Sequence, residues 1–152
     1  MSMPENFSRG RHKKNCITFR RSKSGATTGA RNDYNTSCGG NGPESIFFLD
    51  LDPGYKLTIG QTSNNYDSRH QLAYGGSCPG INTVNCIDDP DTEAISWENR
   101  LDTAERVYFM IDNRYSSGHG DFTIAWNFHE DSLIPYKYQK VYLVPHQLEL
   151  IL

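Results

Sequence analysis

Short segments of alternating apolar and polar residues run along the chain, and clusters of turn-forming residues separate them about every ten positions. This spacing is typical of an antiparallel β-sandwich, because successive side chains of a strand point to opposite faces of its sheet. The strongest alternations are at residues 106–112 and 121–128. Their apolar positions are Val107, Phe109 and Ile111 in the first and Phe122, Ile124 and Trp126 in the second. The pattern predicts an all-β fold, a jelly-roll-like antiparallel β-sandwich of about seven to nine strands.

Weaker alternation predicts further strands on either side of these two. They are expected at residues 16–21, 45–50, 55–61, 69–74, 84–87 and 93–97. Pro53 and Gly54 suit the two central positions of a type II turn, so residues 45–50 and 55–61 are expected to pair as a hairpin. Residues 22–44 are polar and rich in glycine, which predicts a long loop.

Charge divides the chain into a basic beginning and an acidic remainder. Seven of the 15 basic residues lie before position 24, whereas eight basic and seventeen acidic residues follow. We therefore expect a basic, flexible leader over residues 1–23, a sandwich domain over residues 24–128, and a tail over residues 129–152 that is an added strand or disordered. The leader has no helical or zinc-finger framework, so no nucleic-acid partner is expected.

The expected location rests on cysteine usage. No apolar run approaches the roughly 18 residues of a spanning helix, so no membrane span is expected. The first 30 residues also lack the apolar core of a secretory signal. The four cysteines nevertheless favour an oxidising compartment, which predicts a secreted or cell-surface protein without a visible signal peptide.

Several short motifs follow one another in a specific order. They are Gly42-Pro43-Glu44 before an aromatic strand, Pro53-Gly54, Tyr66-Asp67, Cys78, Cys86-Ile87-Asp88-Asp89, Tyr108 to Asp112, and Gly120 to Ile124. In this order, residues of about 16–128 resemble the bacterial pre-peptidase C-terminal domain. Two positions depart from the family pattern, since Glu44 stands where Asp is common and Asn113 replaces the usual Gly.

The resemblance implies a function without catalysis. Its members are secreted β-sandwich modules appended to hydrolases; some bind calcium, and some bind carbohydrate or protein fibres. We therefore predict a non-catalytic extracellular accessory or adhesion module, whose partner is the extracellular matrix, a glycan or the catalytic domain of a host protein. The alternatives are a carbohydrate- or protein-fibre-binding module and, from another class, a small hydrolase. The hydrolase is disfavoured because the chain has no G-x-S-x-G motif and only His70 comes close enough in sequence to serve a cysteine nucleophile.

Four carboxylates form the candidate metal site. Asp88, Asp89, Asp91 and Glu93 lie within six residues of one another. Calcium prefers such hard oxygen ligands, and a cation would relieve the repulsion among the carboxylates. The other interpretation is a solvated acidic loop, because the EF-hand register is absent. Zinc is disfavoured, since the sequence has no C-x-x-C motif and its histidines are scattered.

Exposed aromatic side chains are the candidates for binding a sugar or a peptide face. Tyr66, Tyr115 and Trp97 are the predicted binding residues, with Tyr34 and Tyr74 as further candidates. Among the cysteines, the family resemblance implies a bridge between Cys78 and Cys86. Cys16 and Cys38 are then left for a second bridge, although four cysteines allow three pairings.

Overall fold

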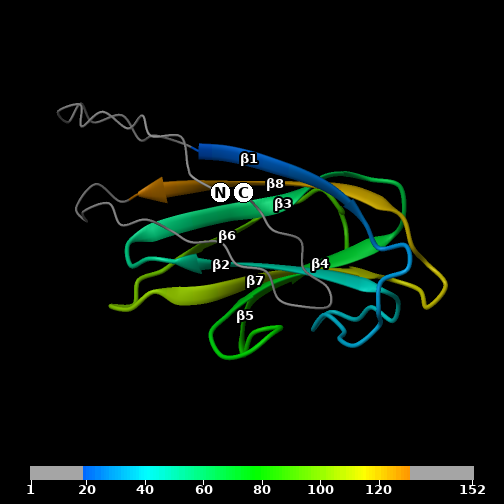
Figure 1. Cartoon of the computed structure of the whole chain (residues 1–152), viewed down its shortest axis with the longest axis horizontal. Coiled ribbons are helices and arrows are strands. Elements are labelled where there is room, and N and C mark those ends of the chain that lie inside the picture. The colour runs from blue at the N-terminus through cyan, green and yellow to red at the C-terminus, as the bar shows by residue number, and fades with distance from the viewer. Residues whose placement is uncertain (1–18, 131–152) are drawn as a thin grey trace, which may run out of the picture.

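A computed structural model describes residues 19–130, and in that range the protein is a sandwich of two antiparallel four-stranded sheets (Figure 1). The strands are β1 (Phe19–Ala26), β2 (Glu44–Leu51), β3 (Tyr55–Asn64), β4 (Ser68–Tyr74), β5 (Asn82–Ile87), β6 (Ile95–Glu98), β7 (Glu105–Asn113) and β8 (Asp121–Glu130). The predicted all-β sandwich is confirmed. Among the described residues there is no helix with the length and apolar character needed to cross a membrane.

The strand order identifies the sandwich as a jelly roll. The first sheet has the order β1-β8-β3-β6 and the second the order β2-β7-β4-β5. Every connection except that between β4 and β5 passes from one sheet to the other, so the two sheets interleave along the chain. This is the eight-stranded arrangement of two Greek keys that defines a jelly roll.

The core lies between the sheets and uses the predicted alternation. All six apolar residues singled out in residues 106–112 and 121–128 belong to it, and each is at most 3% exposed. Phe47 of β2 meets Phe122 of β8 edge to face across the core, with ring centroids 5.9 Å apart. Strands far apart in sequence are therefore joined through their inward-facing side chains.

The predicted hairpin of residues 45–50 and 55–61 is wrong. The turn itself forms, since the Tyr55 N–H donates to the Asp52 carbonyl at 3.2 Å and Gly54 has φ 80°. However, β2 pairs with β7 and β3 pairs with β6 and β8, so the turn joins the two sheets. The same turn residues reverse the chain within a hairpin and between two sheets. The same alternation also buries one face of each strand in both arrangements, so the sequence pattern does not tell them apart.

The predicted boundary of the basic leader is also wrong. β1 begins in the leader and pairs with β8 over eight positions, from Phe19 opposite Phe128 to Ala26 opposite Asp121. Ser22 to Ala26, expected in a loop, thus belong to this strand. Among the described strands, β1 lies at the edge of the first sheet and consists mainly of small and charged residues. It has no apolar alternation that would predict a strand, because its place in the sheet depends on pairing with β8. The rest of the leader, Cys16 and residues 131–152 of the predicted tail lie outside the described residues.

Candidate functional site

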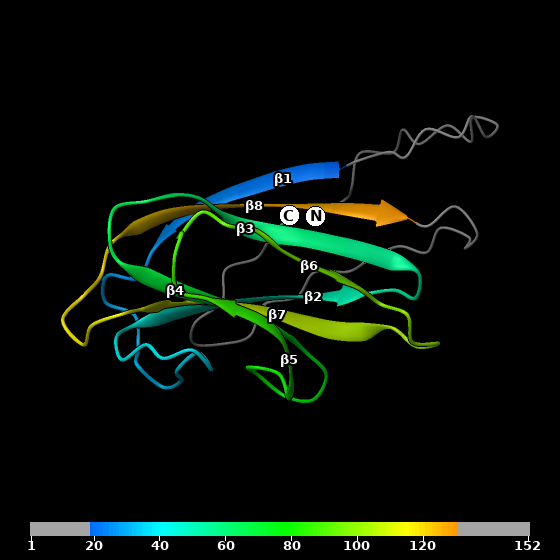
Figure 2. The same cartoon turned by 180° about the vertical axis from the view of Figure 1, so that it is seen from behind.

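Four loops gather at one end of the sandwich, which we call the loop end (Figure 2). They comprise residues 27–43, 65–67, 88–94 and 114–120. Backbone hydrogen bonds connect three of them, since the Asn41 N–H donates to the Asn113 carbonyl at 3.0 Å and the Arg114 N–H donates to the Asp67 carbonyl at 3.1 Å. The fourth loop is reached by a side chain, since Asn64 Nδ2 donates to Asp91 Oδ2 at 2.6 Å. The loop end is therefore a connected surface.

Glu44 anchors the longest of these loops from beneath. Its side chain is fully buried at the start of β2. Its carboxylate accepts the Asp33 N–H at 3.0 and 3.2 Å and the Tyr34 N–H at 3.0 Å. Hydrogen bonds from N–H groups to a carboxylate are stronger than neutral ones, so Glu44 holds residues 33 and 34 in place.

Asp112 is a second buried anchor and lies opposite Glu44 in the pairing of β2 with β7. Its Oδ2 accepts the Thr36 N–H at 3.2 Å. Gly40 has φ +105°, and a Cβ atom there would overlap the Asp112 carboxylate, so this close approach requires glycine. The pKa of Asp112 is raised from 3.8 to about 6, mainly by burial and in part by the negative charge of Glu44.

The raised pKa of Asp112 predicts a loss of stability with rising pH. Unfolded Asp112 loses its proton near pH 4 and folded Asp112 near pH 6, so its contribution is complete below about pH 4 and disappears by about pH 6. The expected slope is about 1.4 kcal/mol per pH unit within this window. Urea unfolding at four pH values from 4 to 7 should show this decline in the parent protein and not in Asp112→Asn. Parallel profiles of the two proteins would contradict the assignment.

Asn113 joins the loop of residues 27–43 to the loop of residues 114–120. Its buried side-chain amide donates to Thr27 Oγ1 at 3.0 Å and to the Pro43 carbonyl. Thr27 Oγ1 in turn accepts the Gly120 N–H at 3.1 Å. A glycine, which the family resemblance places at this position, could not make the side-chain contacts.

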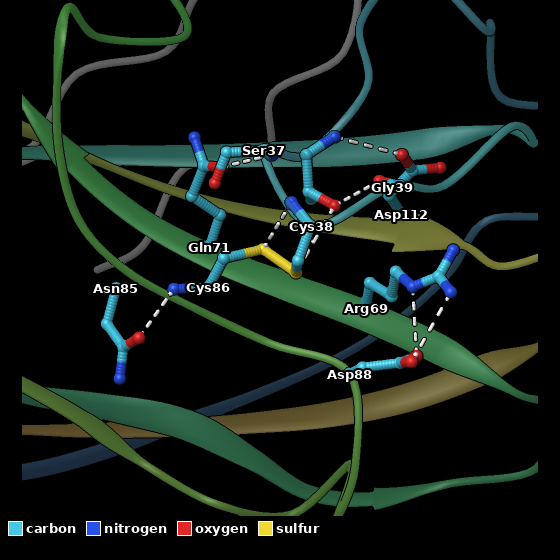
Figure 3. Close-up of a disulfide and its surroundings, with 10 residues drawn as sticks. Ser37, Cys38, Gly39, Arg69, Gln71, Asn85, Cys86, Asp88 and Asp112 are labelled. Atoms are coloured by element: carbon cyan, nitrogen blue, oxygen red, sulfur yellow. Dashed lines mark hydrogen bonds and ion pairs between the residues drawn. A yellow bond between two sulfur atoms is a disulfide. The ribbon is translucent and has the colours of Figure 1, made fainter.

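The disulfide joins Cys38 to Cys86, and the predicted pairing of Cys78 with Cys86 is wrong (Figure 3). The Cα atoms of Cys38 and Cys86 are 5.8 Å apart, and Cys78 is free. Because Cys38 is bonded to Cys86, the second bridge predicted between Cys16 and Cys38 is also wrong. Cys78 lies in the turn that follows Tyr74, whereas Cys86 pairs with Gln71 further along the hairpin. Cys86 lies four positions beyond Asn82 along β5, roughly 13 Å at 3.3 Å per residue, whereas Cys78 lies in the turn before Asn82. This separation places Cys78 out of reach of Cys86.

The disulfide ties the loop of residues 27–43 to the second sheet. Next to it, the Ser37 N–H donates to Gln71 Oε1 at 2.6 Å. Gln71 lies on β4 directly opposite Cys86 on β5, so the covalent bond and this hydrogen bond attach the loop to neighbouring strands (Figure 3). Together with Glu44 and Asp112, they hold the loop at several points along its length.

The structure places the predicted calcium ligands at the loop end, with two of them already in contact with other groups. Asp88 accepts from Arg69 through two bonds, at 2.9 and 3.3 Å. Asp91 Oδ2 accepts from Asn64 Nδ2 at 2.6 Å, while Asp89 and Glu93 are exposed. Over residues 19–130, no three His, Cys, Asp or Glu side chains form a group that could hold a metal ion. Calcium binding by this loop stays a prediction.

The predicted binding aromatics differ in exposure. Tyr115 is 57% exposed in the loop of residues 114–120, and Tyr34, in the longest loop, is 39% exposed. Tyr66 is half-buried against the core, and burial raises its pKa. Trp97 lies on β6 and stacks on Tyr74 with ring centroids 4.3 Å apart. The structure thus offers Tyr34 and Tyr115 as the accessible aromatic groups of the loop end.

His70 and Cys78 do not form a catalytic pair. His70 is fully buried on β4, its ring 5.7 Å from that of the core residue Phe109, and its Nε2 lies 2.7 Å from the Glu93 carbonyl. Cys78 instead packs on residues of the opposite face of the sheet. Burial lowers the pKa of His70. His70 is therefore not placed to act as the base for Cys78.

Sequence reasoning missed the two buried anchors of the loop end. Glu44 belongs to the predicted loop of residues 22–44 and Asp112 ends the predicted strand of residues 106–112, and acidic residues in such places are ordinarily solvated. The one available signal was glycine, because Gly39 and Gly40 precede Glu44 and both have positive φ. Such residues mark a backbone that turns sharply or approaches another group closely, as Gly40 approaches Asp112.

Comparison of the chain with protein-family models, with curated proteins and with solved structures finds no match in any of the three. The class of the protein is thus defined by its own geometry. It is an eight-stranded jelly-roll β-sandwich whose longest loop is anchored by a disulfide and two buried carboxylates.

Proposed function

We propose that the protein is a non-catalytic extracellular accessory or adhesion module of the pre-peptidase C-terminal type, and that its loop end binds a glycan or a protein fibre. The observation that carries this proposal is the presentation of Tyr34 and Tyr115 on anchored loops. Tyrosine combines a large apolar face with a polar tip and few rotatable bonds, so it gains contact area at a low entropic cost.

Anchoring of the loops supports a role in binding. Tyr34 follows directly on Asp33, and the N–H groups of both donate to the buried Glu44 carboxylate. Tyr115 follows Arg114, whose guanidinium lies 5.5 Å from the centre of the Tyr115 ring. A partner that meets loops already held in one arrangement does not have to supply the free energy of ordering them.

Charged pairs at the loop end add polar groups for recognition. Arg114 lies 3.3 Å from Asp67, and Arg69 lies 2.9 Å from Asp88. Such pairs at a surface contribute little to stability, but their unused donors and acceptors can meet the hydroxyls of a sugar or the amides of a peptide. The disulfide supports a location outside the cytosol, where thiols stay oxidised.

Co-sedimentation with insoluble matrices tests the proposal. The probes are collagen fibrils, cellulose and chitin, each with calcium and with a chelator, which also tests the calcium prediction. We expect binding to at least one matrix and an affinity at least about tenfold lower in Tyr34→Ala/Tyr115→Ala, because exposed aromatics dominate such contacts.

Leu101→Ala is the matched control, since Leu101 is 45% exposed but lies between β6 and β7 at the other end of the sandwich. It should bind as the parent protein does. Absence of binding to all three matrices would contradict the fibre- and glycan-binding proposal. An equal loss in Leu101→Ala would show that the loop end is not the binding surface.

A further inference from the structure

A second apolar cluster lies on the outward face of the second sheet. It consists of Ile46 and Phe48 of β2 and Tyr108 and Met110 of β7. The core residues of these strands, such as Phe47 and Phe109, alternate with them, and alternate side chains point to opposite faces. The cluster therefore faces away from the core of the sandwich, where a sheet ordinarily carries polar side chains.

The members of this outward cluster lie directly across from one another. Ile46 is opposite Met110 and Phe48 is opposite Tyr108 in the pairing of β2 with β7. Each of the four side chains is at most 3% exposed. Their burial matches that of the core, so this face is covered.

The described residues cover only part of the outward cluster. Among them, Cys78 is the one hydrophobic residue packed against it. Tyr108 also donates to the Gly76 carbonyl at 2.8 Å, so the loop between β4 and β5 covers the side toward β4. At one end, the Arg106 guanidinium lies 4.5 Å from the centre of the Phe48 ring. The side of the cluster toward Ile46 lies at the edge of the described sheet, along the outer side of β2.

β2 is also an edge strand. Within the part of the chain that the structure describes, β7 is its one strand neighbour, yet its residues are buried on both faces apart from Asp50. An exposed apolar edge of this kind would be a site of aggregation, and proteins usually cover it with another segment.

We infer that residues 131–152, which follow β8, dock on the outward cluster and cover the edge of β2. This segment carries the apolar residues Leu133, Ile134, Val141, Leu143, Val144, Leu148, Leu150, Ile151 and Leu152. Residues 1–18 are the weaker occupant, because Arg9, Arg11, Lys13 and Lys14 would bring charges to an apolar surface. This contact uses the apolar side chains of residues 131–152 and does not involve Tyr34 or Tyr115. The inference therefore does not depend on the proposed function.

The length of the segment is sufficient for this path. Its 22 residues can span roughly 70 Å when extended. The path from the first sheet past the edge of the sandwich is roughly 10 Å, and the eight residues of β2 are roughly 26 Å long.

Full-length variants test this inference by measuring how accessible the outward cluster is. Val141→Asp/Leu143→Asp replaces two apolar side chains of the segment by charged ones. Gln139→Asp/Gln147→Asp is the matched control, because it adds the same charge and leaves the apolar side chains in place. Cys16→Ser is present throughout, so that Cys78 is the thiol that reacts. We expect the first variant to react with a thiol reagent at least about tenfold faster at Cys78 and to bind a hydrophobic dye, because the cover is lost. The second should behave as the parent protein does.

Near-UV circular dichroism, which senses the stacked Tyr74 and Trp97, shows whether the sandwich remains folded. A chain that ends at Glu130 should reproduce the effect of the first variant. An unchanged Cys78 rate in both would overturn the inference. Protection of Cys78 that disappears only when residues 1–18 are deleted would also overturn it, because the cover would then be those residues. Protection of Cys78 that depends on protein concentration would do the same, because the cover would then be a second copy of the chain.

Discussion

Reduction of the disulfide between Cys38 and Cys86 is expected to lower the free energy of unfolding by about 4 kcal/mol. The bond closes a loop with a sequence separation of 48 residues, so it removes many conformations from the unfolded chain. Breaking it also removes the covalent link between Cys38 in the loop of residues 27–43 and Cys86 on β5. Most of the remaining loop contacts are hydrogen bonds, which contribute far less individually.

Urea unfolding with and without a reductant measures this effect. Cys38→Ala/Cys86→Ala should have the stability of the reduced parent protein and should not respond to the reductant. Cys78→Ala is the matched control, because it removes a cysteine that is free in the structure and should keep the full response. Loss of the response in Cys78→Ala would mean that the disulfide joins other residues.

Glu44→Ala is expected to lower the free energy of unfolding by about 3–5 kcal/mol. The substitution leaves the N–H groups of Asp33 and Tyr34 without the carboxylate that accepts them. It also empties a fully buried position at the start of β2. Because Glu44 raises the pKa of Asp112, the substitution should move that pKa down toward its ordinary value.

Hydrogen exchange and urea unfolding check the role of Glu44. In Glu44→Ala, the amides of Asp33 and Tyr34 should exchange much faster than in the parent protein, whereas those of β3 and β8 should stay protected. Glu44→Gln keeps one acceptor oxygen and should cost less. Asp33→Asn removes a charge from the same loop while keeping the backbone N–H, so it should change little. Unchanged exchange at Asp33 and Tyr34 in Glu44→Ala would contradict the anchoring role.

Both predictions concern the arrangement in which the loop end presents Tyr34. Without the disulfide or Glu44, a partner would have to order the loop as it binds, and this cost would weaken binding even where the sandwich stays folded. Binding by these variants therefore separates two contributions, the tyrosine side chains and the anchored backbone beneath them.

The sequence by itself determined the fold class and the main core. Val107, Phe109 and Ile111 alternate with other residues along one strand, and this period of two allows one face to be buried whichever strand pairs with it. The turn at Pro53 and Gly54 was equally evident, because proline sets one φ angle and glycine accepts the next. These properties depend on residues close together in the chain.

Only the tertiary structure decided which strands pair and which groups meet. β2 and β3 lie in different sheets because β7 and β8 provide their partners, and Cys86 bonds to Cys38 because the loop passes over β5. Glu44 and Asp112 became anchors because N–H groups of that loop reach them. Tyr108 and Met110, on the face where a sheet ordinarily carries polar side chains, joined a second apolar cluster. All these outcomes depend on contacts between distant parts of the chain, which a local pattern does not specify.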